Sequence, residues 1–108
     1  MIYPTIVMDW EKSEAYLLIE LNDVLMEEPF ISIQEKNISN GRKYEYVLNE
    51  RGRENMLEFA TKIYEGIVAE NEIAVKVGSE YQLLFPSDED KENFRIVMGD
   101  YYRLTSIF

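Results

Sequence analysis

The sequence predicts an α+β fold in which about three helices pack on one face of a single, mainly antiparallel sheet. Three observations predict this class. Apolar segments rich in β-branched and aromatic residues recur along the chain, two glycine-containing turn signals each separate a pair of them, and one long segment repeats apolar residues at three- and four-residue steps. The predicted order of elements is β-α-β-β-α-β-β-α-β.

The N-terminal part predicts a strand followed by a helix. Residues 2–8 are β-branched and apolar, as is typical of a strand. Asp9 suits a helix N-cap, and we expect a helix over 10–27 that is stopped by Pro29. A strand over 15–21 stays open as the alternative, because much of that segment is apolar on every face. The apolar stripe of the helix would consist of Trp10, Leu17, Leu18, Leu21 and Leu25.

The middle of the chain predicts a hairpin and the clearest helix. Asn40-Gly41 favours a type I′ turn, so the flanks 31–39 and 42–48 should pair. Apolar residues then recur at helical steps over about 51–69. The predicted buried side of this helix consists of Met56, Phe59, Ala60, Ile63, Tyr64, Ile67 and Val68.

A second hairpin follows, because Gly78-Ser79 suits a type II′ turn between residues 73–77 and 81–85. Ser87 and Asp90 then form a capping box, which predicts the start of a third helix.

Gly99 suits a helix stop, and residues 101–108 are apolar enough to predict a last, paired strand. The first 77 residues then resemble ferredoxin-like folds in their order β-α-β-β-α-β. That fold carries many functions, so the resemblance implies no activity. Without a linker or low-complexity segment, residues 1–108 predict one acidic α+β domain.

Cysteine and histidine are both absent, which excludes disulfides, thiolate metal sites and the common nucleophile–histidine pairs within this chain. The densest acidic cluster, residues 88–90, does not fit a calcium loop, because Asn93 and Gly99 stand at its sixth and twelfth positions. Carboxylate-only chemistry stays open. We expect a protein that is not an enzyme and needs neither a cofactor nor a metal.

The chain carries 21 acidic and 11 basic residues, for a formal charge of −10. Acidic residues are in excess in both halves, so the charge is not confined to a tail. Such a surface should attract basic proteins and repel nucleic acid and anionic membranes. The plain alternative is that the charge serves solubility alone. With no signal peptide or membrane-spanning segment in the sequence, we expect a cytoplasmic protein.

Two groups of residues are candidates for partner binding. Acidic side chains would form the outer face of the first helix, and tyrosines, which are enriched at interfaces, would lie on strands. Each group also has a structural explanation, as a solvated helix face or as packing in a sheet. The candidates are Glu11, Glu14, Asp23, Glu27, Glu28, Tyr44, Tyr46, Tyr101 and Tyr102.

These features favour a small inhibitor or immunity-type protein that neutralises a basic partner such as a nuclease toxin. A DNA mimic that occupies the groove of a nucleic-acid-binding enzyme, of phage origin for example, is the second hypothesis, and it requires carboxylates in two rows. The third is a carboxylate-based enzyme or ligand-binding regulatory domain, with at least two of Asp9, Glu11, Glu14, Asp88 and Asp90 converging in a pocket. The apolar first and last strands also leave a homodimer open.

Overall fold

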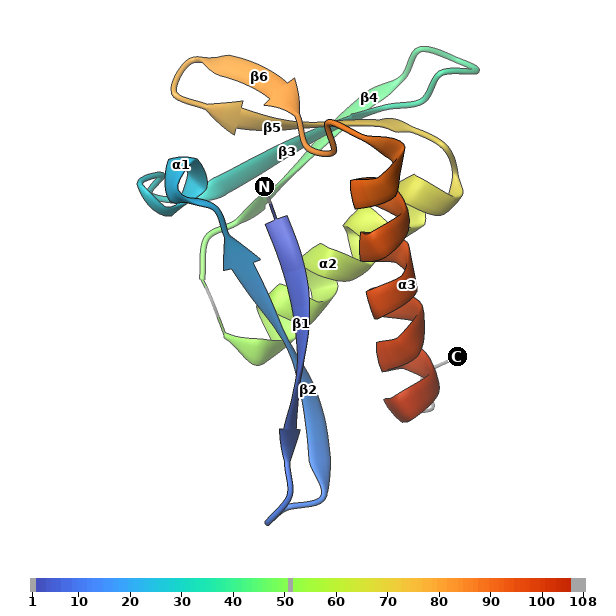
Figure 1. Cartoon of the computed structure of the whole chain (residues 1–108). Coiled ribbons are helices and arrows are strands. Elements are labelled where there is room, and N and C mark those ends of the chain that lie inside the picture. Colours follow the sequence, from blue (N-terminus) through green and yellow to red (C-terminus); the bar gives the residue numbers. More distant parts are fainter. Residues whose placement is uncertain (1, 51, 106–108) are drawn as a thin grey trace.

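The computed structural model describes residues 2–50 and 52–105 and arranges them in three helices and six strands (Figure 1). In chain order these are β1 (Ile2–Asp9), β2 (Glu14–Leu21), α1 (Asp23–Met26), β3 (Ile31–Lys36), β4 (Lys43–Leu48), α2 (Arg53–Val68), β5 (Glu72–Val77), β6 (Glu80–Leu83) and α3 (Asp88–Thr105).

The strands form two separate antiparallel sheets, so the α+β class is confirmed but the single sheet is not. One sheet is the β1–β2 hairpin, and the other has the strand order β4-β3-β5-β6. Helix α2 crosses below the four-stranded sheet, while α3 and the β1–β2 hairpin extend away from it beside α2 (Figure 1). The observed order β-β-α-β-β-α-β-β-α also replaces the predicted ferredoxin-like start.

The helix predicted over 10–27 is wrong, and the strand alternative over 15–21 is confirmed as β2. All eight residues of β1 pair with β2, from Ile2 opposite Leu21 to Asp9 opposite Glu14. The polar side chain of Asp9 acts at a turn instead of a helix start, since its Oδ1 accepts the Lys12 N–H at 3.3 Å. Only α1 remains of the predicted helix.

Both other hairpins are confirmed, although only one has the predicted turn. Gly78 has a φ of +62° and directly precedes Ser79 between the paired Val77 and Glu80, as a type II′ turn requires. Gly41 also has a positive φ, of +72°, but Asn40 does not, which excludes type I′. The loop between β3 and β4 is longer, and the Asn37 side chain accepts the backbone N–H groups of residues 39 and 40.

Helix α3 starts as predicted and continues past the predicted stop. The Ser87 hydroxyl oxygen accepts the Asp90 N–H at 3.2 Å, which caps the first turn. Gly99 lies within the helix, and residues 101–105, predicted as strand, form its last turns. Residues 106–108 of the predicted strand lie outside the described residues. The helix continues because it brings Tyr101 and Tyr102 into the core, where both are buried.

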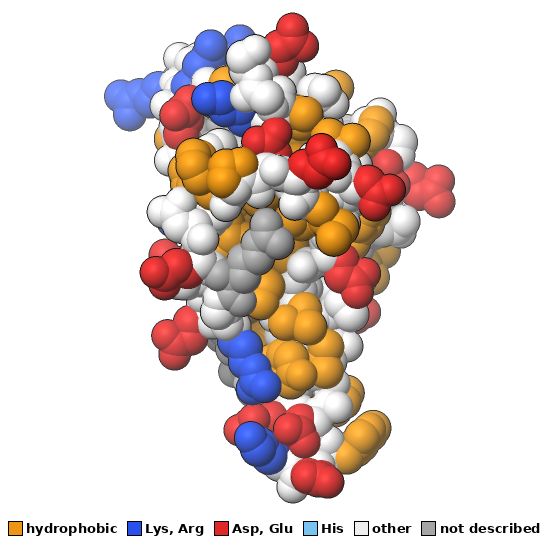
Figure 2. Space-filling view, turned by 90° about the vertical axis from the view of Figure 1, so that its left-hand side faces the viewer, with side chains coloured by type: hydrophobic (Ala, Val, Ile, Leu, Met, Phe, Trp, Pro, Cys, Tyr) orange, Lys and Arg blue, Asp and Glu red, His pale blue; other side chains and the backbone are white. Residues whose placement is uncertain are grey.

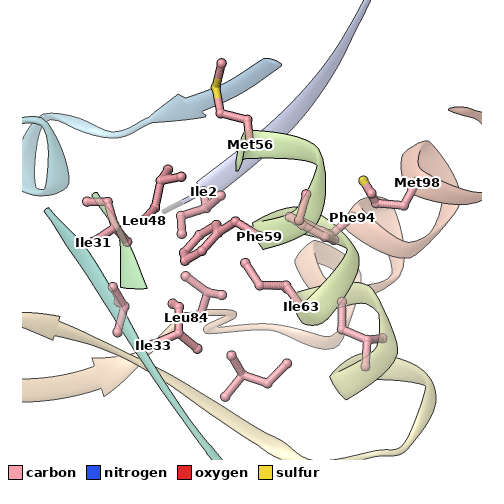
Figure 3. Close-up of a cluster of buried hydrophobic side chains, with 14 of the residues drawn as sticks. Ile2, Ile31, Ile33, Leu48, Met56, Phe59, Ile63, Leu84, Phe94 and Met98 are labelled. Carbon is pink, nitrogen blue, oxygen red and sulfur yellow. The ribbon is translucent and has the colours of Figure 1, made fainter. Parts of the chain in front are cut away.

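The core forms where the inner face of the four-stranded sheet meets α2, α3 and the hairpin. Ile31 and Ile33 of β3 face Phe59 and Ile63 of α2, and Phe94 of α3 closes the cluster (Figure 3). The rings of Phe85 and Phe94 meet edge to face at 5.3 Å. Within the described residues, no helix is long and apolar enough to cross a membrane.

The position of Gly99 yields a first test. Gly99→Ala should raise the free energy of unfolding by about 0.5–1 kcal/mol, because alanine restricts the unfolded chain and favours helix. An added Cβ would meet only the Arg103 side chain, at 4.0 Å. Urea unfolding followed by circular dichroism measures the change. A loss of stability would instead indicate a helix that stops at this glycine.

Candidate functional site

The acidic residues predicted for one helix face lie in three different places. Glu11 and Glu14 lie at the tip of the β1–β2 hairpin, Asp23 begins α1, and Glu27 and Glu28 follow α1. Glu28 has a structural role, because its Oε1 accepts the Gly78 N–H at 2.8 Å and so holds the β5–β6 turn. There is thus no acidic helix face.

Two of the four predicted tyrosines are buried and unavailable to a partner. Tyr101 is 5% exposed and Tyr102 is 3% exposed. The Tyr102 hydroxyl lies 2.7 Å from the Thr61 hydroxyl, and its ring meets that of Tyr64 edge to face. Burial raises the pKa of both Tyr101 and Tyr102. Tyr102 thus packs α3 against α2, and both tyrosines belong to the core, which corrects the expectation of a contact surface.

The other two tyrosines, Tyr44 and Tyr46, lie on the same face of β4 and border a hollow of about 450 Å³ beside α2. A carboxylate that sequence reasoning missed also lines this hollow. Glu35 stands opposite Tyr44 on β3, in the inward register of Ile31 and Ile33, and is only 3% exposed. A buried carboxylate next to tyrosines in a hollow is typical of a binding site.

Glu35 has no cationic partner among the residues that the structure describes. Its carboxylate accepts a neutral hydrogen bond from the Asn71 Nδ2 at 3.2 Å, and the hydroxyl of Tyr46 also interacts with it. The four ion pairs of the described residues all lie elsewhere. Because a buried carboxylate is costly unless it is paired, this arrangement is unusual for a residue that serves packing alone.

Helix α2 leaves room for this carboxylate only because residue 66 is glycine. A Cβ at Gly66 would lie 2.1 Å from the Glu35 Oε1, well inside van der Waals contact. The chain turns after α2 so that the Asn71 N–H reaches the Gly66 carbonyl at 3.0 Å. The Asn71 side chain then lies between Glu35 and Tyr44, and it donates to the Tyr44 hydroxyl at 3.0 Å.

The Tyr46 hydroxyl is the other buried polar group of the hollow. It is buried and makes no well-formed hydrogen bond with any described residue. Burial is the main cause that raises its pKa, and the nearby Glu35 carboxylate adds to this effect. Tyr46 is therefore a neutral phenol. Its ring packs edge to face on Phe59 at 5.6 Å.

The sequence does contain a signal for this site. Ile31, Ile33 and Glu35 alternate in one strand, which places the glutamate in the buried register of two isoleucines. Gly66, which lies in the interior of the predicted helix, is the second signal, since a glycine inside a helix can mark a close approach. What the sequence could not show is that these two positions face each other.

The tip of the β1–β2 hairpin is the second candidate site. It projects from the body at the end away from the four-stranded sheet (Figure 1). Trp10, the single tryptophan, lies on this tip and is 82% exposed, and Met8 beside it is 40% exposed. Within this turn the Asp9 Oδ1 accepts the Lys12 N–H, and Ser13 takes a left-handed φ of +53°. The indole is thus presented by a defined turn.

An arginine bound inside this chain shows how a cation can be held by tyrosine and glutamate. The Arg53 guanidinium lies 3.8 Å from the centre of the Tyr16 ring, and its Nη1 lies 4.0 Å from the Glu14 Oε2. This contact ties the start of α2 to the β1–β2 hairpin close to its turn. It combines a cation–π contact with an exposed ion pair.

No three acidic residues among the described positions converge closely enough to hold a metal ion. Comparison of the chain with protein-family models, with curated proteins and with solved structures found no match. The function must therefore be inferred from the two sites themselves.

The contact between Gly66 and Glu35 yields a second test. Gly66→Ala should lower the free energy of unfolding by about 1–3 kcal/mol, because the new methyl group displaces the buried carboxylate. Gly99→Ala is the matched control, since it makes the same change in a helix with open space and should stabilise. In the Glu35→Ala background, Gly66→Ala should lose most of its cost, which a double-mutant cycle by urea unfolding measures. Equal costs in both backgrounds would disprove the contact.

Proposed function

We propose that this protein is an inhibitor or immunity-type protein that binds another protein, and that it is not an enzyme. It would bind a basic partner such as a nuclease toxin through the tip of the β1–β2 hairpin. The exposure of Trp10 on that projecting tip is the observation that carries the proposal. Tryptophan is the residue most enriched among those that supply binding energy at interfaces. An ordered turn also presents it with little loss of entropy on binding.

Charge at the tip supports a basic partner. Residues 9–14 contain three carboxylates, Asp9, Glu11 and Glu14, and a single lysine. Figure 2 shows acidic, basic and hydrophobic side chains close together at this end of the molecule. A partner with an apolar cavity rimmed by arginine or lysine would complement both the indole and the carboxylates. The overall charge of −10 would speed their encounter.

The other two hypotheses have less support. A DNA mimic needs two rows of carboxylates, whereas the acidic side chains on the face in Figure 2 are scattered among neutral and hydrophobic ones. The enzyme hypothesis needs two of the five acids named for it in one hollow. Glu14, Asp88 and Asp90 each line a different hollow among those described.

Trp10 also offers the test, because its fluorescence reports on the tip alone. The tagged chain should retain a basic protein when it is mixed with the product of the adjacent gene. On binding, the emission of Trp10 should shift to shorter wavelength and become protected from acrylamide quenching, since the indole leaves water. Trp10→Ala should weaken the complex by about 2 kcal/mol or more. Added salt should weaken it further by screening the carboxylates.

Leu83→Ala is the matched control, because Leu83 is 63% exposed on β6, outside the hairpin. It should leave the affinity unchanged. A captured partner that is acidic, or a complex in which acrylamide still quenches Trp10 fully, would contradict the proposal.

A further inference from the structure

We propose that the hollow around Glu35 is a binding pocket for a guanidinium group, the head group of an arginine side chain. The pocket is distinct from the hairpin tip and needs no contact there. Its lining includes Glu35, Tyr44, Tyr46, Glu65 and Asn71. The class of ligand is inferred from the polar groups of the pocket that have no hydrogen-bond donor or charge partner within the described part of the chain.

The pocket has more acceptors than donors. The Asn71 side-chain amide already donates two hydrogen bonds, one to Glu35 and one to the Tyr44 hydroxyl. The Glu35 carboxylate has no cation, and the buried Tyr46 oxygen has no donor among the described residues. A ligand that brings several N–H groups and a positive charge would complement these acceptors. A guanidinium carries five N–H donors in one plane and a charge that persists at neutral pH.

Two carboxylates near the pocket have different roles. Glu65 of α2 lines the hollow and adds negative charge beside Tyr46, whose pKa it helps to raise. Glu45 instead uses its Oε1 on the opposite face of the sheet, where it accepts hydrogen bonds from Gln34 and Tyr81. Glu35 is thus the carboxylate available inside the pocket, with Glu65 at its border.

Lys62 is a basic group that also lines the pocket, where its ammonium lies over the Tyr46 ring and beside Glu58. Its Nζ lies 5.6 Å from the centre of the Tyr46 ring and 3.7 Å from the Glu58 Oε1. Glu58 lines the adjoining hollow of about 280 Å³ and not this one. Lys62 therefore leaves Glu35 unpaired, although its charge opposes a cationic ligand. Removal of that charge should strengthen binding.

The aromatic walls favour guanidinium over ammonium. A planar guanidinium can stack on a tyrosine ring while it donates to a carboxylate, whereas an ammonium is a compact, strongly hydrated charge. The chain already holds Arg53 in this manner, between Tyr16 and Glu14. The pocket around Glu35 offers the same two kinds of group, a carboxylate and the rings of Tyr44 and Tyr46.

The test uses small probes titrated into the full chain and followed by NMR. N-acetyl-L-arginine methylamide should shift the backbone resonances of Glu35, Gly66 and Asn71 in a saturable way. The citrulline analogue, which has the same shape without the charge, should bind at least about tenfold more weakly, a difference of about 1.4 kcal/mol. The affinity of the lysine analogue should lie between those of the arginine and citrulline analogues. The proposal would be overturned if the citrulline analogue bound as tightly as the arginine probe. It would also be overturned if the arginine probe shifted resonances elsewhere on the molecule and not those around Glu35.

A comparison of probes distinguishes the source of the guanidinium. Tighter binding of blocked arginine than of agmatine indicates an arginine in a protein segment, and the reverse indicates a free small molecule. Both results support the pocket, whereas failure of both probes overturns it. Neither result depends on Trp10 or on the basic partner, so the pocket and the proposed function succeed or fail separately.

Two variants test the residues themselves. Glu35→Gln should abolish the preference for arginine over citrulline, while Glu89→Gln, an exposed change on α3, should preserve it. Tyr46→Phe should weaken binding a few-fold, because it removes a buried hydroxyl oxygen that accepts no hydrogen bond within the described residues. Lys62→Gln should strengthen binding. If Tyr46→Phe destabilises the free protein and leaves binding unchanged, the hydroxyl is structural and the proposal is wrong.

Discussion

The close crossing of helix α2 over strand β3 is the constraint on which the rest of the structure depends. At Gly66 the helix backbone approaches the Glu35 carboxylate so closely that no side chain fits between them. The same crossing lets Phe59 and Ile63 reach Ile33 in the core. If the helix were displaced outward by the width of a methyl group, the core packing would loosen and the pocket would widen as well. Core and pocket are therefore consequences of one contact.

Much of the fold could be predicted because its signals are local. The apolar repeat of α2 needs only the helical period, and Gly78-Ser79 needs only the backbone preference of glycine in a type II′ turn. The capping of α3 by Ser87 is likewise contained in four residues. Helix α2 and the β5–β6 hairpin have nearly the predicted bounds, and α3 has the predicted start.

The failures occurred where a local signal permits two outcomes and tertiary contacts choose between them. An aspartate such as Asp9 can accept backbone N–H groups at a helix start or in a hairpin turn. Asp9 lies in a hairpin turn and not at a helix start because β2 can pair with β1 along its whole length and bury Leu17. Gly99 is tolerated inside α3 for a similar reason, since the extended helix buries Tyr101 and Tyr102 in the core, with Tyr102 against Tyr64 of α2. The site was missed because only the fold brings Glu35, Gly66 and Asn71 together.

The two candidate sites break local rules in opposite ways. At the pocket a carboxylate occupies an apolar register without a cation, and at the tip a tryptophan stands in water. Neither choice stabilises the isolated chain, and such departures concentrate at functional positions. The hairpin tip lies at the end of the molecule away from the four-stranded sheet that carries Glu35 (Figure 1). Because sites that share no residues act additively as a rule, a partner held at Trp10 should leave the guanidinium pocket free to bind independently.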